Sequence, residues 1–149
     1  MNQLIISILA FVAGILLTIQ GGLNTQLGIL LKHPLLATLV AFFFSMCFSI
    51  IFVLSSVKSY PTTQQIKAIP TYLWFTGGLF SMLGVSLYYY TIPKLGVSTM
   101  ISLGLCGQLF FSVIAGHFGW FGLPVEPITL KRSLGILAMG SGILLINLK

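Results

Sequence analysis

Long apolar stretches alternate along the chain with short segments that contain proline, glycine or charged residues. The pattern predicts helices over residues 4–31, 35–57, 72–92, 97–117 and 128–148. Each stretch reaches or exceeds the roughly 20 residues that cross a bilayer as a helix, and a helix satisfies its own backbone in lipid. We therefore expect an all-α integral membrane bundle of five transmembrane helices, forming a single transmembrane domain over residues 1–149.

A polar patch, Gln20-Gly-Gly-Leu-Asn24, interrupts the first apolar stretch. Gln20 and Asn24 are four residues apart, so in a helix their amides share one face. An unpartnered amide in hydrocarbon costs about 2 to 7 kcal/mol, so these side chains should face other helices, a cavity or the membrane edge. They either bind a polar solute or fasten two helices together, and both interpretations stay open.

The same stretch is longer than one membrane crossing requires. Its 28 residues, 4–31, would reach about 42 Å as a helix, against a hydrocarbon core of ~30 Å. It is therefore tilted, emerges from the core at its far end, or is broken near Gly21-Gly22, because each glycine lowers helix propensity by about 1 kcal/mol. Broken helices expose backbone groups to the solute in many transporters.

The candidate substrate-binding residues are Gln20, Asn24, Gln108, Trp74 and Tyr88. Gln108 lies near the middle of the fourth stretch and is the expected partner of Gln20 or Asn24. Trp74 and Tyr88 lie near the two ends of the third stretch, where aromatic side chains anchor helices at the membrane surfaces. The alternative is that the two rings stack against a solute or gate it.

Composition favours a protein that lies in the lipid bilayer. Hydrophobic residues make up 57% of the chain and charged residues 5%, whereas soluble domains carry about 25% charged residues. The net charge of +6 comes from Lys and Arg at the ends of the stretches, which is typical of membrane anchors and not of a nucleic-acid surface. Cys47 and Cys106 show no disulfide or metal-ligand spacing, so we expect no metal and no cofactor.

Glu126 is the one side-chain carboxylate of the chain. If transport is coupled to protons, the candidates for protonation are Glu126, His117 and His33, all expected near the membrane edges. The alternative is that these side chains contact water or lipid headgroups. One loop carboxylate and two separated histidines supply neither a nucleophile and its base nor a ligand cluster, so we do not expect an enzyme.

Basic residues are divided almost evenly between the two predicted membrane faces. Four fall on the face of the N-terminus and three on the opposite face, namely Lys58, Lys67, Lys131 and Arg132 against Lys32, Lys94 and Lys149. An excess of one basic residue is too small for the positive-inside rule to fix a single orientation, so we expect that the chain can insert in either orientation. Two oppositely oriented copies would form the inverted-repeat arrangement of many secondary transporters. The sequence therefore favours an antiparallel homodimer, or a pair with a homologous partner chain.

A series of short motifs extends from Gly14 to Gly142. It comprises Gln20-Gly-Gly-Leu-Asn24-Thr-Gln-Leu, Ala41-Phe-Phe, Trp74 with Gly77-Gly78, Pro93-Lys-Leu-Gly96, Gly107-Gln108, His117-Phe-Gly119, Pro124, and Arg132 with Gly135. This series resembles the YdcZ-type five-span family of the drug/metabolite transporter superfamily. The resemblance implies a multi-pass protein of the bacterial cytoplasmic (inner) membrane, half of a ten-helix inverted-repeat transporter. The chain departs from the family pattern at Gly116, where an acidic residue is often found.

We therefore expect a small-molecule transporter of the drug/metabolite type, which works by alternating access as an antiparallel pair of five-helix units. The alternative is a non-transporting membrane subunit that stabilises a partner protein through its glycine- and serine-rich helix faces. A small multidrug exporter is disfavoured, because such exporters use a membrane-embedded glutamate and the first stretch contains no acid.

Overall fold

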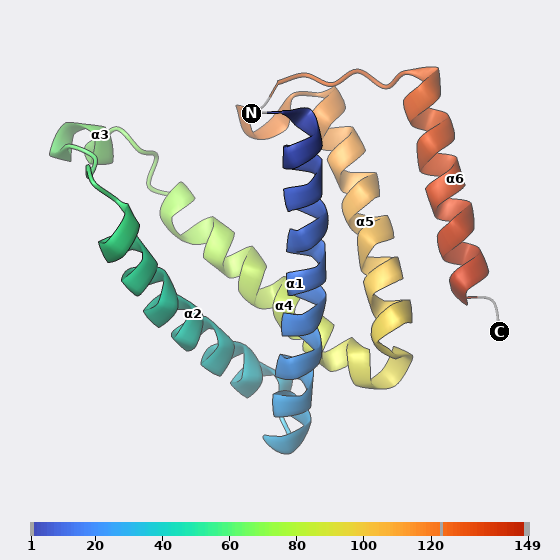
Figure 1. Cartoon of the computed structure of the whole chain (residues 1–149), viewed down its shortest axis with the longest axis horizontal. Coiled ribbons are helices and arrows are strands. Elements are labelled where there is room, and N and C mark those ends of the chain that lie inside the picture. The colour runs from blue at the N-terminus through green and yellow to red at the C-terminus, as the bar shows by residue number, and fades with distance from the viewer. Residues whose placement is uncertain (1, 123, 148–149) are drawn as a thin grey trace. The chain divides into compact units, whose positions relative to one another are not determined.

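The computed structural model describes residues 2–122 and 124–147, and this part of the chain is helical without any strand (Figure 1). The elements are α1 (Gln3–Leu30), α2 (Pro34–Ser56), α3 (Thr63–Lys67), α4 (Leu73–Leu95), α5 (Val97–His117), the 3-10 helix η1 (Trp120–Gly122) and α6 (Leu130–Asn147). The predicted all-α class is confirmed. The predicted end of the last stretch, residue 148, lies outside the described residues, as does Lys149.

Three helices of the described part, α1, α2 and α5, are long and apolar enough to cross a membrane. The two other long helices are more polar for identifiable reasons. Three consecutive tyrosines, residues 88–90, lower the hydropathy of α4, and Lys131-Arg132 does the same in the first turn of α6. The fold is thus that of a multi-pass helical membrane protein, while the count of five spans stays a prediction.

Helix ends follow local sequence chemistry. Asn2 caps α1 by accepting the Leu4 N–H, and Pro34 occupies the first turn of α2, where its missing N–H has no helical partner to lose. Thr62 and Gln65 form a reciprocal capping box that starts α3 within the polar connection. These caps satisfy the donors that the first turn of a helix leaves unpaired.

The turn expected at residues 93–96 is shorter than predicted. Helix α4 continues through Pro93 to Leu95, and the chain turns at Gly96, whose φ of 86° is a conformation that side-chain-bearing residues rarely adopt. Pro93 is tolerated because it lies in the last turn of α4, where its missing N–H removes a single helical hydrogen bond.

The chain divides after Lys94 into two compact units. The first contains α1 to α4, and the second contains α5, η1 and α6. In the first unit, α1 and α2 lie close together at the turn that joins them and diverge away from it (Figure 1). In the second, α5 and α6 pack along their length, and the Asn147 amide donates to the Ser102 hydroxyl at 3.0 Å.

Small residues bring α1 and α2 together. A Cβ atom added at Gly28 would lie 3.4 Å from the Ala37 Cβ and 3.6 Å from the Pro34 Cα. Ala37 is completely buried, and Thr38 and Ala41 are buried beside it. Close packing of this kind drives helix association in lipid, where no hydrophobic effect acts between helices.

Helix α1 runs unbroken through Gly21 and Gly22, so of the three interpretations of its length the break at these glycines is ruled out. Packing explains the difference, because a Cβ atom at Gly21 would lie 3.8 Å from the Cδ1 atom of Ile92 on α4. This is an ordinary van der Waals distance, so α1 packs against Ile92 as a regular helix. Tertiary contacts routinely override a propensity deficit of about 1 kcal/mol.

The tight α1–α2 contact predicts that Ala37→Leu destabilises the protein by about 1 to 3 kcal/mol, because added methylenes in a filled interface force the helices apart. The control is Ala13→Leu, since Ala13 is exposed on α1. The midpoint of thermal unfolding in detergent micelles compares the variants. Equal midpoints for the two would show that the contact around Ala37 is not tight.

Candidate functional site

The predicted amide pair of α1 converges on a tyrosine of α4. The Gln20 side-chain amide donates to the Tyr89 hydroxyl at 3.4 Å, and the Asn24 side chain lies within hydrogen-bonding reach of the same hydroxyl. Tyr89 is 3% exposed, whereas Gln20 and Asn24 are half-buried. The four-residue spacing thus has the predicted effect, because both amides approach one partner from one helix face.

Further polar groups lie where α1, α2 and α4 meet. The Thr38 and Ser86 hydroxyls, from α2 and α4, lie 3.0 Å apart. Thr25 is buried on α1 at 4% exposure, between Gly21, which faces α4, and Gly28, which faces α2. Its hydroxyl has no hydrogen-bond partner among the described residues, although threonines in helices commonly donate to a carbonyl one turn back.

We call this set of six residues the polar seam: Gln20, Asn24 and Thr25 of α1, Thr38 of α2, and Ser86 and Tyr89 of α4. All six side chains are uncharged, and all belong to the first unit. Beside them pack the buried Ala37 and Ala41, which close the junction on its apolar side. The seam therefore offers hydrogen-bond donors and acceptors without a fixed charge.

The aromatic candidates of α4 occupy different positions. Tyr88 is half-buried and packs against the cluster of Ala37, Ala41 and Tyr89. Trp74 is 60% exposed and lies 15 residues before Tyr89, which is about 22 Å along a helix. The structure therefore brings Tyr88 to the seam and leaves Trp74 at the far end of α4.

Sequence reasoning missed four residues of the seam, namely Thr25, Thr38, Ser86 and above all Tyr89. Within the run of residues 88–90 it alone is buried, and Ile92, three residues later, is buried on the same side against Gly21. The spacing of Ser86, Tyr89 and Ile92 is a helical signal, but it becomes informative only when the neighbouring helix is known. Gln108, the last amide candidate, is exposed on α5 in the second unit.

The three candidates for protonation all lie at helix ends or in connections. His33 precedes α2, and its backbone N–H donates to the Gly28 carbonyl at 3.0 Å. His117 ends α5 and is exposed, with its ring 5.0 Å from that of Phe118. Glu126 lies between η1 and α6 and forms an ion pair with Arg132. Sequence reasoning placed Arg132 at the membrane edge and did not identify this pairing.

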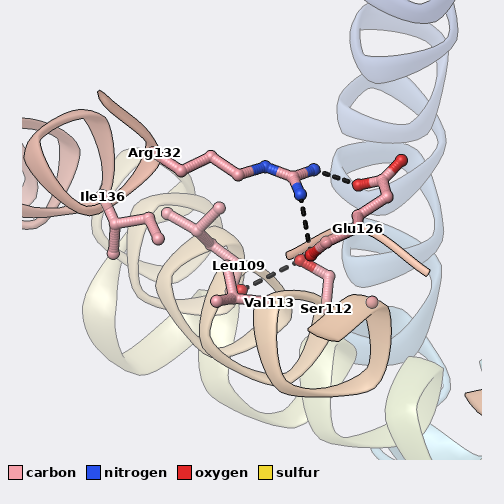
Figure 2. A pocket seen from close by; sticks show the side chains of 7 residues that line it. Leu109, Ser112, Val113, Glu126, Arg132 and Ile136 are labelled. Atoms are coloured by element: carbon pink, nitrogen blue, oxygen red, sulfur yellow. Dashed lines mark hydrogen bonds and ion pairs between the residues drawn. The ribbon is translucent and has the colours of Figure 1, made fainter. Parts of the chain in front are cut away.

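Glu126 and Arg132 border a pocket of about 170 Å³ in the second unit (Figure 2). The Glu126 backbone N–H donates to the Gly116 carbonyl at 2.8 Å, and the Arg132 guanidinium donates to the Glu126 carbonyl at 3.0 Å. Apolar side chains line the other wall: Leu109 and Val113 of α5 and Ile136 of α6. The pocket thus combines one positive and one negative side chain with an apolar wall.

No group of three or more His, Cys, Asp or Glu side chains in the described part of the chain is close enough to hold a metal ion. Cys47 and Cys106 are free thiols. The uncharged seam and the pocket beside Glu126 are two polar sites of the described structure.

A family model described as "Putative inner membrane exporter, YdcZ" matches residues 5–145. The match includes every residue of the polar seam and of the pocket. No curated protein and no solved structure matches the chain.

The geometry predicts an energetic coupling between Gln20 and Tyr89. In a double-mutant cycle of Gln20→Leu and Tyr89→Phe, we expect a coupling of about 0.6 kcal/mol, the usual size for a hydrogen bond between membrane helices. The free energy of unfolding in mixed micelles measures it. A matched cycle of Gln26→Leu with Tyr89→Phe should give no coupling, because Gln26 is exposed elsewhere on α1. A coupling of zero in both cycles would contradict the contact.

Proposed function

We propose that the polar seam binds the small solute which the protein transports. The chain belongs to the YdcZ family, described as putative inner membrane exporters. The family membership, which the motif series already indicated, makes the chain a multi-pass membrane transporter of the inner membrane. The observation that carries the proposal is the convergence of Gln20 and Asn24 on Tyr89.

Hydrogen-bonding capacity supports this role for the seam. A side-chain amide carries two donors and an acceptor, and the contact with Tyr89 occupies one donor of Gln20. Because both amides are half-buried, their remaining groups can reach a solute that enters beside α1. The seam contains no charged side chain, so the expected solute is polar and carries its hydrogen-bonding groups without requiring a counter-charge there.

The proposed working unit is an antiparallel pair of chains, each with five membrane-spanning helices, that exposes its site alternately to the two sides. The even distribution of Lys and Arg supports insertion in both orientations. A five-helix half-unit of this kind needs a partner of opposite orientation to complete an inverted repeat. In this proposal the chain is a transporter and not an enzyme, and its substrate belongs to the drug or metabolite type.

We expect Asn24→Ala and Tyr89→Phe to lower the rate of solute export about two- to tenfold, because each removes one hydrogen bond of about 0.5 to 1.5 kcal/mol. Mass spectrometry of the medium identifies the exported solute by comparing cells that express the protein with cells that do not. The same measurement then compares the variants at equal membrane abundance.

Gln26→Ala is the matched control for these variants, because it removes an exposed amide from the same helix. It should export at the wild-type rate. Loss of membrane abundance in Asn24→Ala and Tyr89→Phe, with normal export per remaining molecule, would contradict solute binding. That result would mean that the seam only holds α1 against α4.

The antiparallel pair predicts that the C-terminus of the chain is found on both sides of the membrane. Fusions after the last residue test this, one to a fluorescent protein active only in the cytoplasm and one to alkaline phosphatase, active only outside. We expect both reporters to be active. Activity of a single reporter would contradict dual insertion and would require a separate partner chain of opposite orientation.

A further inference from the structure

The pocket beside Glu126 has no role in the proposed function, yet it combines features of a binding site. Figure 2 shows the Arg132 side chain extending along the pocket toward the Glu126 carboxylate, with Leu109 and Val113 below it. The two charged side chains are 44% and 56% exposed, for Arg132 and Glu126 respectively. Both can therefore exchange partners with a ligand that arrives from outside.

Each charged group has unused bonding capacity. A guanidinium carries five N–H donors, and two of its nitrogens donate here, one to the Glu126 carbonyl and one to its carboxylate. The second carboxylate oxygen of Glu126 points away from the guanidinium (Figure 2). A ligand can thus add bonds to either residue without first breaking the ion pair.

The position of Glu126 depends on its backbone as well as on its side chain. Its N–H is bonded to the Gly116 carbonyl near the end of α5, and its carbonyl accepts from Arg132 in the first turn of α6. The loop therefore stays attached at this residue when the carboxylate changes partner. This separates the binding role of the carboxylate from its structural role.

We propose that this pocket binds a small zwitterion in which an ammonium group and a phosphate are joined by a short linker. The phosphate oxygens accept from the unused Arg132 N–H groups, aided by the partial positive charge of the first turn of α6. The ammonium group donates to the Glu126 carboxylate. The linker lies against the apolar wall of Leu109, Val113 and Ile136.

Charge balance selects a zwitterion over a simple ion. A lone anion bound to Arg132 would lie near the like-charged Glu126 carboxylate, and a lone cation on Glu126 would lie near the like-charged guanidinium. Like charges placed side by side weaken binding. A ligand with both charges meets an opposite charge at each end.

The size of the pocket limits what enters it. Its volume is about 170 Å³. This is enough for a compact polar group such as phosphoethanolamine and too little for the acyl chains of a lipid. The same group has two sources, the headgroup of phosphatidylethanolamine and free phosphoethanolamine in water.

Binding to the purified full-length protein in detergent tests the proposal. The probes are dioctanoyl phosphatidylethanolamine, dioctanoyl phosphatidylglycerol, which has the phosphate without the ammonium, and free phosphoethanolamine. Isothermal titration calorimetry gives the affinities. We expect at least one of the two zwitterions to bind at least about tenfold more tightly than the phosphatidylglycerol. Binding of the lipid alone identifies a headgroup site, and binding of the free compound identifies a site for a water-soluble ligand.

Three variants should weaken zwitterion binding about tenfold or more: Glu126→Gln, Arg132→Gln and Val113→Phe. The last fills the apolar wall and leaves both charged residues in place, so it tests the pocket even if the first two unfold. Lys131→Gln is the control, because it removes a neighbouring charge that does not line the pocket. Wild-type affinity in Val113→Phe, equal affinity for the phosphatidylglycerol, or no binding of either zwitterion would overturn the proposal.

This test is independent of the proposed transport function. Asn24→Ala should retain zwitterion binding, because Asn24 lies in the first unit and the pocket in the second. Failure of the binding experiment leaves the export experiment on the seam unaffected, and the reverse also holds.

Discussion

The need to satisfy polar side chains without water shapes the first unit. Gln20 lies within an apolar helix, and its hydrogen bond to Tyr89 ties α1 to α4 through two long side chains. The contact between α1 and α2 is of the opposite kind, because Gly28 and Ala37 let the two helices approach closely. Helix α1 thus contacts α2 through small residues and α4 through long polar side chains, and the polar groups lie where these two contacts meet.

The sequence was informative where a single helix carries the signal. The spacing of Gln20 and Asn24 predicts a shared face, and both residues approach the same hydroxyl. It was uninformative where the partner comes from elsewhere, since only the contacts with α1 and α2 distinguish the buried Tyr89 from its neighbours in the run of residues 88–90. Of the three interpretations of the long first stretch, the break near Gly21-Gly22 is ruled out, because α1 is continuous there and packs against Ile92 of α4.

The pairing of the charged groups depends on the conformation of a short connection. The sequence identifies Glu126 as the one carboxylate, and the structure pairs it with Arg132, six residues later in the first turn of α6. The resemblance to the family leads one to expect an acid at position 116, which is glycine here. A Cβ atom added at Gly116 would lie 3.8 Å from a carboxylate oxygen of Glu126. The loop thus brings a carboxylate next to the position where the family pattern often has an acidic residue and this chain has glycine.

The two polar sites differ in the kind of ligand that their surroundings favour. In the seam, uncharged amides and hydroxyls are buried or half-buried, and a charged solute there would lose its hydration without gaining a counter-charge. At the pocket, the Arg132 and Glu126 side chains are about half exposed, so their ion pair adds little to the stability of the fold. Each residue can therefore exchange its partner at small cost. Desolvation therefore favours a neutral polar solute in the first site and a ligand with matched charges in the second.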